Sequence, residues 1–220
     1  MILQIYFMMR TYLWILLFFG LGSAFAQNRA ADSIQKILKS EHNEVNRVHL
    51  LNALSDAYKP SMPEKMRQFG QQALELSQKI DDRKGQGDAF INLGNSFVLQ
   101  SDYRKALTLF QKAKEIFETE NQSDPEVKIG LAKSLGSLGI IFSEQSNYTK
   151  ALEFYLKSVT IYEAIGDQDR CAKLFNNIGV LYQSQKSYYK ALSYFAKTEK
   201  ILKKKQDPIL GVTYTNIGNS

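Results

Sequence analysis

The apolar side chains between residues 90 and 202 recur at steps of three and four, and their order is written three times. A polar break interrupts each copy. Steps of three and four gather apolar side chains on one face of an α-helix, so each copy predicts two amphipathic helices joined by a tight turn. The copies span residues 96–110, 141–155 and 181–195 and read SFVLQSDYRKALTLF, IFSEQSNYTKALEFY and LYQSQKSYYKALSYF.

Small residues occupy two fixed places in the pattern. A glycine recurs at spacings of 45, 40 and 39 residues, and an alanine follows each of the first three glycines by twelve residues. A glycine inside a helix is less favourable than alanine by ~1 kcal/mol, so its recurrence indicates a packing role. We expect glycine and alanine to face each other across the two arms and to bring the helix axes close together. These residues are Gly94, Gly139, Gly179 and Gly218, with Ala106, Ala151 and Ala191; an aromatic ring stands four residues after each alanine, at Phe110, Tyr155 and Phe195.

Capping residues mark the predicted helix ends. Asp102, Asn147 and Ser187 each stand four residues before their alanine. Such side chains accept hydrogen bonds from the free N–H groups of a first helical turn. Gly166 follows the second helix of one copy and suits the left-handed conformation that ends many helices. Each unit is therefore predicted to be a helical hairpin, followed by a linker to the next hairpin.

The order aromatic or leucine, Leu-Gly, aromatic, alanine, aromatic resembles the tetratricopeptide repeat (TPR) over about residues 48–220. The resemblance implies an all-α fold, an α-solenoid of antiparallel helical hairpins. The family period is 34 residues. The period here is 39–45, which we interpret as long linkers between hairpins. In this feature and in its NLG and NNIG sequences, the chain is similar to the long-linker TPR subclass of kinesin light chains and bacterial sensor proteins.

The pattern also sets the order of units along the chain. A degenerate unit with Leu54-Ser55 in place of Leu-Gly precedes three regular units, and a short helix at Asp32–Ser40 is expected to cap it. The last repeat is truncated to its first helix, so we expect a longer protein; a frayed terminus is the alternative. The predicted divisions are a capping region at 27–47, a degenerate TPR at 48–84, TPRs at 85–124, 125–167 and 168–207, and the first helix of an incomplete TPR at 208–220.

The N-terminus differs from the rest of the chain. Arg10 lies just ahead of an apolar run that ends in AFA at residues 24–26. A small-x-small site after such a run is typical of a signal peptide, so residues 1–26 are predicted to be removed. The run spans residues 11–26, fewer than the ~20 that cross a bilayer as a helix. An uncleaved anchor is the alternative. We expect an exported protein, in the periplasm or cell envelope.

Charge and cysteine content narrow the possible functions. The 220 residues carry a net charge of +6 that is spread along the chain. This mild charge and the expected export argue against nucleic acid as a partner. Cys171 is the single cysteine, so no intramolecular disulfide can form and packing alone must hold the fold. We interpret Cys171 as a small buried or half-buried side chain rather than a catalytic thiol, because neither histidine is near it in sequence.

The sequence contains no catalytic constellation, phosphate-binding loop or metal-ligand spacing, so we expect neither enzyme activity nor a cofactor in this chain. A solenoid presents the first helix of each hairpin on a concave face, and the TPR resemblance implies that this groove binds a protein or an extended peptide. Inward positions include His49, Asp88 and Ser137. The residues expected to bind ligand are Asn52, Asn92, Asn95, Lys133, Lys173, Asn176, Asn177 and Asn216.

The residue types in this groove suggest how a ligand is held. A carboxamide both donates and accepts, as a peptide backbone requires, and the two lysines can pair with a carboxylate. A solvated polar face is the alternative. The function expected is an exported binding module, the N-terminal sensory or scaffold part of a longer bacterial signalling protein whose output domain, such as a histidine kinase, lies downstream. A stand-alone scaffold for an envelope complex is the alternative. Membrane contact is expected only through an uncleaved signal or a downstream segment.

Overall fold

The computed structural model describes residues 29–58 and 62–203, together with residues 213, 215, 216 and 218. These residues form helices and turns with no strand among them, which confirms the predicted all-α class. A helix at residues 29–40 lies where the sequence predicts the capping helix. In this part of the chain no helix is both long and apolar enough to cross a bilayer.

Two predicted segments fall largely outside the described residues. The predicted signal peptide, residues 1–26, lies wholly outside them. Within the incomplete repeat, residues 213, 215, 216 and 218 are helical, as a first helix requires.

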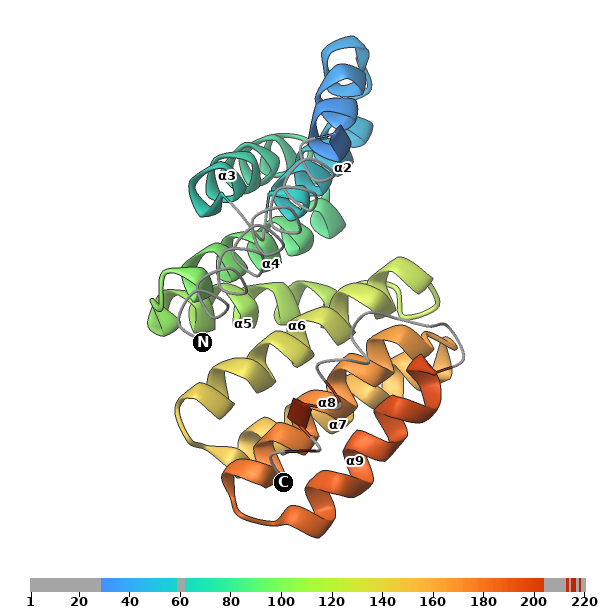
Figure 1. Ribbon diagram of the computed structural model, residues 1–220. Coiled ribbons are helices and arrows are strands. Elements are labelled where there is room, and N and C mark those ends of the chain that lie inside the picture. Colours follow the sequence, from blue (N-terminus) through green and yellow to red (C-terminus); the bar gives the residue numbers. More distant parts are fainter. Residues whose placement is uncertain (1–28, 59–61, 204–212, 214, 217, 219–220) are drawn as a thin grey trace, which may run out of the picture.

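The helices pair into antiparallel hairpins that stack one after another into a curved solenoid (Figure 1). Each helix packs on the next in the chain, and α2 also packs on α4 and α4 on α6. This arrangement confirms the predicted α-solenoid. The hairpins are α2 (Glu44–Ala57) with α3 (Pro63–Lys79), α4 (Arg83–Leu99) with α5 (Tyr103–Thr119), α6 (Pro125–Glu144) with α7 (Tyr148–Ala164), and α8 (Gln168–Ser184) with α9 (Tyr188–Leu202).

The prediction of long linkers between hairpins is wrong. Residues 120–124 join α5 to α6, and residues 165–167 join α7 to α8. The extra length of each repeat lies in its helices, which have 17 residues in α4, α5, α7 and α8 and 20 in α6. Asp82, Asp124 and Asp167 each cap the next first helix with a side-chain oxygen. These caps start the helices directly after the preceding hairpin, and a repeat period alone does not reveal them.

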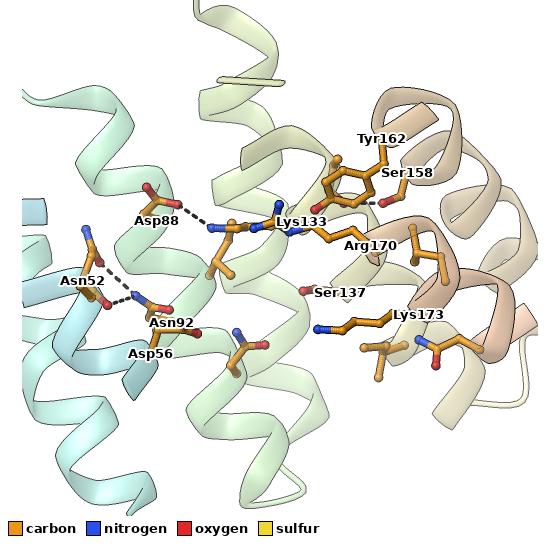
Figure 2. A pocket seen from close by; sticks show the side chains of 18 of the residues that line it. Asn52, Asp56, Asp88, Asn92, Lys133, Ser137, Ser158, Tyr162, Arg170 and Lys173 are labelled. Carbon is orange, nitrogen blue, oxygen red and sulfur yellow. Dashed lines mark hydrogen bonds and ion pairs between the residues drawn. The ribbon is translucent and has the colours of Figure 1, made fainter. Parts of the chain in front are cut away.

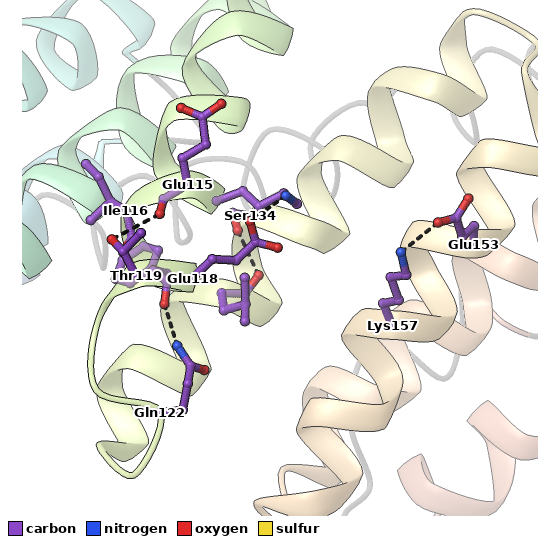
Figure 3. A network of polar contacts seen from close by, with 11 residues as sticks. Glu115, Ile116, Glu118, Thr119, Gln122, Ser134, Glu153 and Lys157 are labelled. Carbon is purple, nitrogen blue, oxygen red and sulfur yellow. Dashed lines mark hydrogen bonds and ion pairs between the residues drawn. The ribbon is translucent and has the colours of Figure 1, made fainter.

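The connection between α5 and α6 is held by side chains that cap the end of α5 (Figure 3). Gln122 donates from Nε2 to the carbonyl oxygen of Phe117 at 2.7 Å, and Thr119 donates to that of Ile116 at 2.9 Å. The last carbonyls of a helix have no partner within it, so these bonds satisfy groups that would otherwise need water. Figure 3 also shows the exposed pair of Lys157 and Glu153, one turn apart on α7.

Two of the three N-caps predicted inside the hairpins are confirmed. Asp102 and Asn147 accept from backbone N–H groups of α5 and α7 at 3.2 and 3.3 Å. Ser187 occupies the same position before α9, but its side chain makes no capping hydrogen bond, so this part of the prediction is wrong. Gly166 ends α7 with a φ of 76°, as predicted. A left-handed residue also stands in four other turns, at Asp81, Ser101, Ser146 and Lys186.

Three of the four recurring glycines have an aromatic ring as their nearest neighbour across the hairpin. A Cβ on Gly139 would lie 2.5 Å from Cδ1 of Tyr155. A helical side chain leans toward the N-terminus of its helix, so a ring one turn beyond the alanine reaches back over the glycine. A ring therefore covers each of these glycines, and the alanines of the same hairpins are fully buried. The other two pairs are Gly94 with Phe110 and Gly179 with Phe195, each at 2.4 Å.

The degenerate hairpin, α2 with α3, packs in the same way, but it has larger residues at the small positions and a glycine at the position of the ring. Met66 and Ser55 stand where the regular units have alanine and glycine, and Gly70 stands where they have the ring. The Ser55 hydroxyl donates to the carbonyl oxygen of Met66 at 2.6 Å. A Cβ on Gly70 would lie 3.2 Å from Ser55 Oγ, so the missing ring makes room for the larger neighbours.

Two buried hydroxyls tie second helices to first helices. Ser158 of α7 donates to the carbonyl oxygen of Ala132 at 2.7 Å, and Thr198 of α9 donates to that of Ala172 at 3.1 Å. Both side chains are fully buried. A hydrogen bond of this kind contributes roughly 0.5–1.5 kcal/mol, so each hydroxyl stabilises its own hairpin.

Candidate functional site

The first helices of the hairpins line a polar groove of about 500 Å³ (Figure 2). Each contributes residues three and four apart, which is the spacing of one helix face. Ser158 and Tyr162 of α7 lie behind the part of the groove between α6 and α8. The remaining lining residues are His49, Asn52, Ala53 and Asp56 of α2, Asp88, Ile91, Asn92 and Asn95 of α4, Ala132, Lys133, Gly136, Ser137 and Ile140 of α6, and Arg170, Lys173, Leu174 and Asn177 of α8.

The structure places six of the eight predicted ligand-binding residues in this groove: Asn52, Asn92, Asn95, Lys133, Lys173 and Asn177. Asn176 and Asn216 are not among the lining residues. They hydrogen-bond to each other instead, with Nδ2 of Asn216 donating to Oδ1 of Asn176 at 3.0 Å. The roles of all eight in binding stay predictions, but their positions separate them into two kinds.

Asn52 and Asn92 hold the solenoid together. Asn92 donates from Nδ2 to both the carbonyl oxygen and Oδ1 of Asn52 at 3.1 Å (Figure 2). Asn52 in turn donates to the carbonyl oxygen of Gly85 at 3.1 Å. Both asparagines are buried at the floor of the groove, so these bonds join α2 to α4 with little exposure to water. The Nδ2 groups of both amides therefore bond within the fold.

Asn95, Asn177 and Lys173 line the groove without a hydrogen bond or ion pair to any described residue. Asn95 and Asn177 are half-buried and Lys173 is exposed. Their polar groups are the ones that a ligand can reach without breaking a contact of the fold.

The charges in the groove are divided between its two ends (Figure 2). Asp56 and Asp88 come from α2 and α4, whereas Lys133, Arg170 and Lys173 come from α6 and α8. Lys133 and Asp88 meet in the middle, with Nζ 3.9 Å from Oδ1. Burial raises the pKa of the Asp88 carboxyl above its ordinary value, although Lys133 opposes this shift by favouring the charged form. Asp56 has no ion-pair partner among the described residues.

Arg170 is held in place by contacts near the N-terminus of α8. Its guanidinium pairs with the Asp167 carboxylate and lies over the Tyr162 ring, 5.6 Å from the centroid. Burial raises the pKa of the Asp167 carboxyl, but the hydrogen bonds and positive charge of Arg170 outweigh it and hold this pKa below its ordinary value. Sequence reasoning missed Arg170, and it also missed Asp56, which stands at the same repeat position as Asn95 and could have been found from that register.

Metal and thiol chemistry find no support in the part of the chain that the structure describes. No group of three His, Cys, Asp or Glu side chains there is placed to hold a metal ion. Cys171 is buried in the core, as predicted, and burial raises the pKa of its thiol to about 11.

The family model for the tetratricopeptide repeat matches residues 62–119 and 130–204. These ranges make up more than half of the chain and contain most of the helices from α3 to α9. The protein therefore belongs to the TPR family. Members of this fold class serve as protein–protein interaction modules. No curated protein matches the chain.

Three solved structures illustrate the likeness in fold. BtubC from P. vanneervenii is 19% identical with a TM-score of 0.68, over 88% of this chain and 79% of that one. A Rap protein complexed with Competence and Sporulation Factor is 15% identical with a TM-score of 0.74, over 88% of this chain and 54% of that one. The TPR-sensor STAND protein PH0952 from Pyrococcus horikoshii is 22% identical with a TM-score of 0.63, over 82% of this chain and 28% of that one. The chain thus spans about half the length of the Rap protein.

Proposed function

We propose that the groove binds an extended peptide, either free or as a segment of a partner protein. The observation that carries the proposal is the set of unpaired polar groups, Asn95, Asn177, Lys173 and Asp56, along one continuous groove. Extended backbones present donors and acceptors in alternation, which carboxamides complement. The similar fold of a Rap protein in complex with Competence and Sporulation Factor supports this choice of ligand class. The mixed charges of the groove favour a peptide over nucleic acid, which needs a continuous basic surface.

A displayed library of random dodecapeptides tests this function directly. Peptides selected on the purified protein should lose affinity for the variant Lys173→Glu, because the reversed charge faces the ligand. Lys39→Glu is the matched control, since Lys39 is exposed on the helix at 29–40 and does not line the groove. A library that yields no groove-dependent peptide contradicts the proposal.

The finer proposal is an exported sensory or scaffold module of a longer signalling protein. It rests on the signal-peptide pattern of residues 1–26 and on the likeness in fold to the TPR-sensor protein PH0952. Residues 1–26 fused to an alkaline phosphatase that is active only outside the cytoplasm should give activity, and Leu16→Arg in the apolar run should abolish it. An inactive wild-type fusion contradicts export. A downstream reading frame that lacks a membrane helix and an ATP site contradicts the sensor-kinase form of the proposal.

A further inference from the structure

The turns inside the hairpins lie along one edge of the solenoid, and the connections between hairpins lie along the other, because successive helices run antiparallel. In Figure 1 the turns of the α4–α5, α6–α7 and α8–α9 hairpins lie on the left, and the α5–α6 and α7–α8 connections lie on the right. We name the first edge the turn edge, with described residues 62–65, 99–105, 144–150 and 184–190, and the second the linker edge, with residues 79–85, 119–127 and 164–170.

The two edges carry net charges of opposite sign. The turn edge has six basic and three acidic side chains among its described residues, whereas the linker edge has four basic and seven acidic side chains. All of the basic groups of the turn edge except Lys105 are without an ion-pair partner among the described residues. The positive charge of this edge is therefore available to a partner. Its basic residues are Lys65, Arg104, Lys105, Lys150, Lys186 and Lys190.

Large apolar side chains protrude from the same edge. Tyr189 is 92% exposed and Leu99 is 50% exposed, and Tyr188 and Met62 are also exposed. No large hydrophobic side chain is exposed in the residues that make up the linker edge. A single exposed apolar residue is ordinary on a protein surface. The informative observation is that protruding apolar groups and unpaired basic groups occur together on one edge, and that neither feature occurs on the other.

Aromatic rings hold three of the lysines at the same place in successive hairpins. Each ammonium nitrogen lies 5.1–5.3 Å from a ring centroid. A cation over a ring face is attracted by the ring, and the lysine stem covers apolar surface while its charged end stays in water. The turn edge thus presents a row of positive charges, one or more in each hairpin. The pairs are Lys105 with Phe97, Lys150 with Phe142 and Lys190 with Tyr182.

Basic groups and protruding apolar side chains on one edge are the combination that binds an anionic lipid surface. Lysine and arginine are attracted to acidic head groups, and apolar and aromatic side chains enter the boundary between head groups and acyl chains. The exposed apolar side chains of the turn edge come from three different turns. A fluid bilayer accepts scattered side chains of this kind, whereas a folded protein partner would need a pocket for each of them.

We infer that the turn edge lies on a membrane surface that is rich in anionic phospholipid. Tyr189 and Leu99 enter the interface, and Arg104 and the lysines contact the head-group phosphates. No residue of the turn edge lines the groove. The contact therefore leaves the groove open, and the inference is independent of the proposed peptide-binding function.

Co-sedimentation of the full chain with lipid vesicles tests the inference. The protein should bind vesicles of equal parts phosphatidylcholine and phosphatidylglycerol roughly tenfold or more tightly than vesicles of phosphatidylcholine alone, because each basic group is attracted to the acidic head groups. Raising the salt concentration from ~0.1 M to ~1 M shortens the screening length from ~10 Å to ~3 Å and should remove this preference. Any binding through the apolar run of residues 11–26 is common to all variants, so it cancels in their comparison.

Charge reversal on the turn edge provides the main comparison. Arg104→Glu combined with Lys186→Glu should weaken binding to the anionic vesicles by roughly tenfold or more. Both side chains are exposed and neither pairs with another described residue, so the fold should tolerate the change. Lys36→Glu combined with Lys39→Glu is the matched control, because it makes the same change in net charge at two exposed positions of the helix at residues 29–40. The control should retain the affinity of the wild type to within about threefold.

A fluorophore reports whether the turn edge itself touches lipid. Tyr189→Cys labelled with a polarity-sensitive dye should shift its emission to the blue on the anionic vesicles, whereas the same dye on Ser123→Cys, at the linker edge, should not. Cys171 is buried, so the dye reacts chiefly with the introduced thiol of the folded protein. Tyr189→Ser should weaken vesicle binding by about threefold without changing the melting temperature, because the ring is almost fully exposed.

Three results would overturn the inference. The first is equal affinity for the two kinds of vesicle at low salt. The second is equal weakening by the two charge-reversed variants, or equal dye shifts at residues 123 and 189. The third is a protein that ignores both kinds of vesicle but binds polyglutamate through Arg104 and Lys186, which would make the turn edge a site for acidic proteins. Each of these results leaves peptide binding in the groove untouched, so the proposed function is tested separately.

Discussion

Two glycines three residues apart on α6 should respond to the same substitution in opposite ways. In Gly139→Ala the new methyl would lie 2.5 and 2.6 Å from Cδ1 and Cε1 of Tyr155. The Tyr155 ring is buried in the core, so it can yield only by displacing its neighbours. In Gly136→Ala the new methyl would lie 3.4 Å from its nearest neighbours, which is an ordinary contact.

The expected magnitudes follow from two effects. Alanine is favoured over glycine inside a helix by ~1 kcal/mol, and this gain applies to both substitutions. Overpacking of a filled core costs about 1–3 kcal/mol, and this applies to Gly139→Ala alone. Gly136→Ala should therefore raise the free energy of unfolding by up to ~1 kcal/mol, and Gly139→Ala should fall below it by about 1–3 kcal/mol. The shared helix makes the propensity gain cancel in the comparison.

Urea denaturation followed by far-ultraviolet circular dichroism measures both free energies of unfolding. A double-mutant cycle with Tyr155→Leu adds a control, because the smaller side chain leaves room for the methyl and should make Gly139→Ala less destabilising. Equal effects at the two glycines, or a cycle without coupling between residues 139 and 155, would refute the packing argument.

Three further predictions concern single positions. Lys186 holds a φ of 58°, so Lys186→Gly should stabilise the protein by ~1 kcal/mol in thermal denaturation; an unchanged melting temperature would show that the turn is not strained. Ser158→Ala removes the buried bond to Ala132 and should cost roughly 1 kcal/mol in urea denaturation, whereas Thr149→Ala on the exposed face of the same helix should cost much less. Burial raises the pKa of the Cys171 thiol to about 11, so a thiol reagent at pH 8 should label the folded protein far more slowly than the unfolded protein; equal labelling rates would contradict burial.

Much of the fold can be predicted from residues that recur. Helical hairpins, their order and the TPR class follow from the period of apolar, small and aromatic residues, because each unit must bury the same face against its neighbour. The caps at Asp102 and Asn147 and the left-handed turn at Gly166 follow from local backbone chemistry. The lengths of the linkers cannot be predicted from the repeat period, because the period is the sum of the helix lengths and the linker lengths. Their division depended on caps such as Asp82 and Asp124, which the repeat pattern does not mark.

The sequence predicts which helix faces line the groove, but not which of its polar side chains are left without a hydrogen bond inside the protein. Helical register placed six of the eight expected residues there, because side chains three and four apart share one side of a helix. Asn92 and Asn177 occupy the same position in their repeats and cannot be told apart by spacing. Asn92 is buried and hydrogen-bonded to Asn52, whereas Asn177 lines the groove without a hydrogen bond to a described residue.

The sequence by itself therefore determined the plan of each hairpin: two helices, the place of the turn between them, and which side chains face its interior. The tertiary structure alone decided which polar groups remain available, because a hydrogen bond between first helices depends on side chains some 40 residues apart in the chain. It also showed that an aromatic ring lies directly over Gly94, Gly139 and Gly179. Local periodicity fixes the direction of a side chain, whereas its partner is set by how neighbouring hairpins stack.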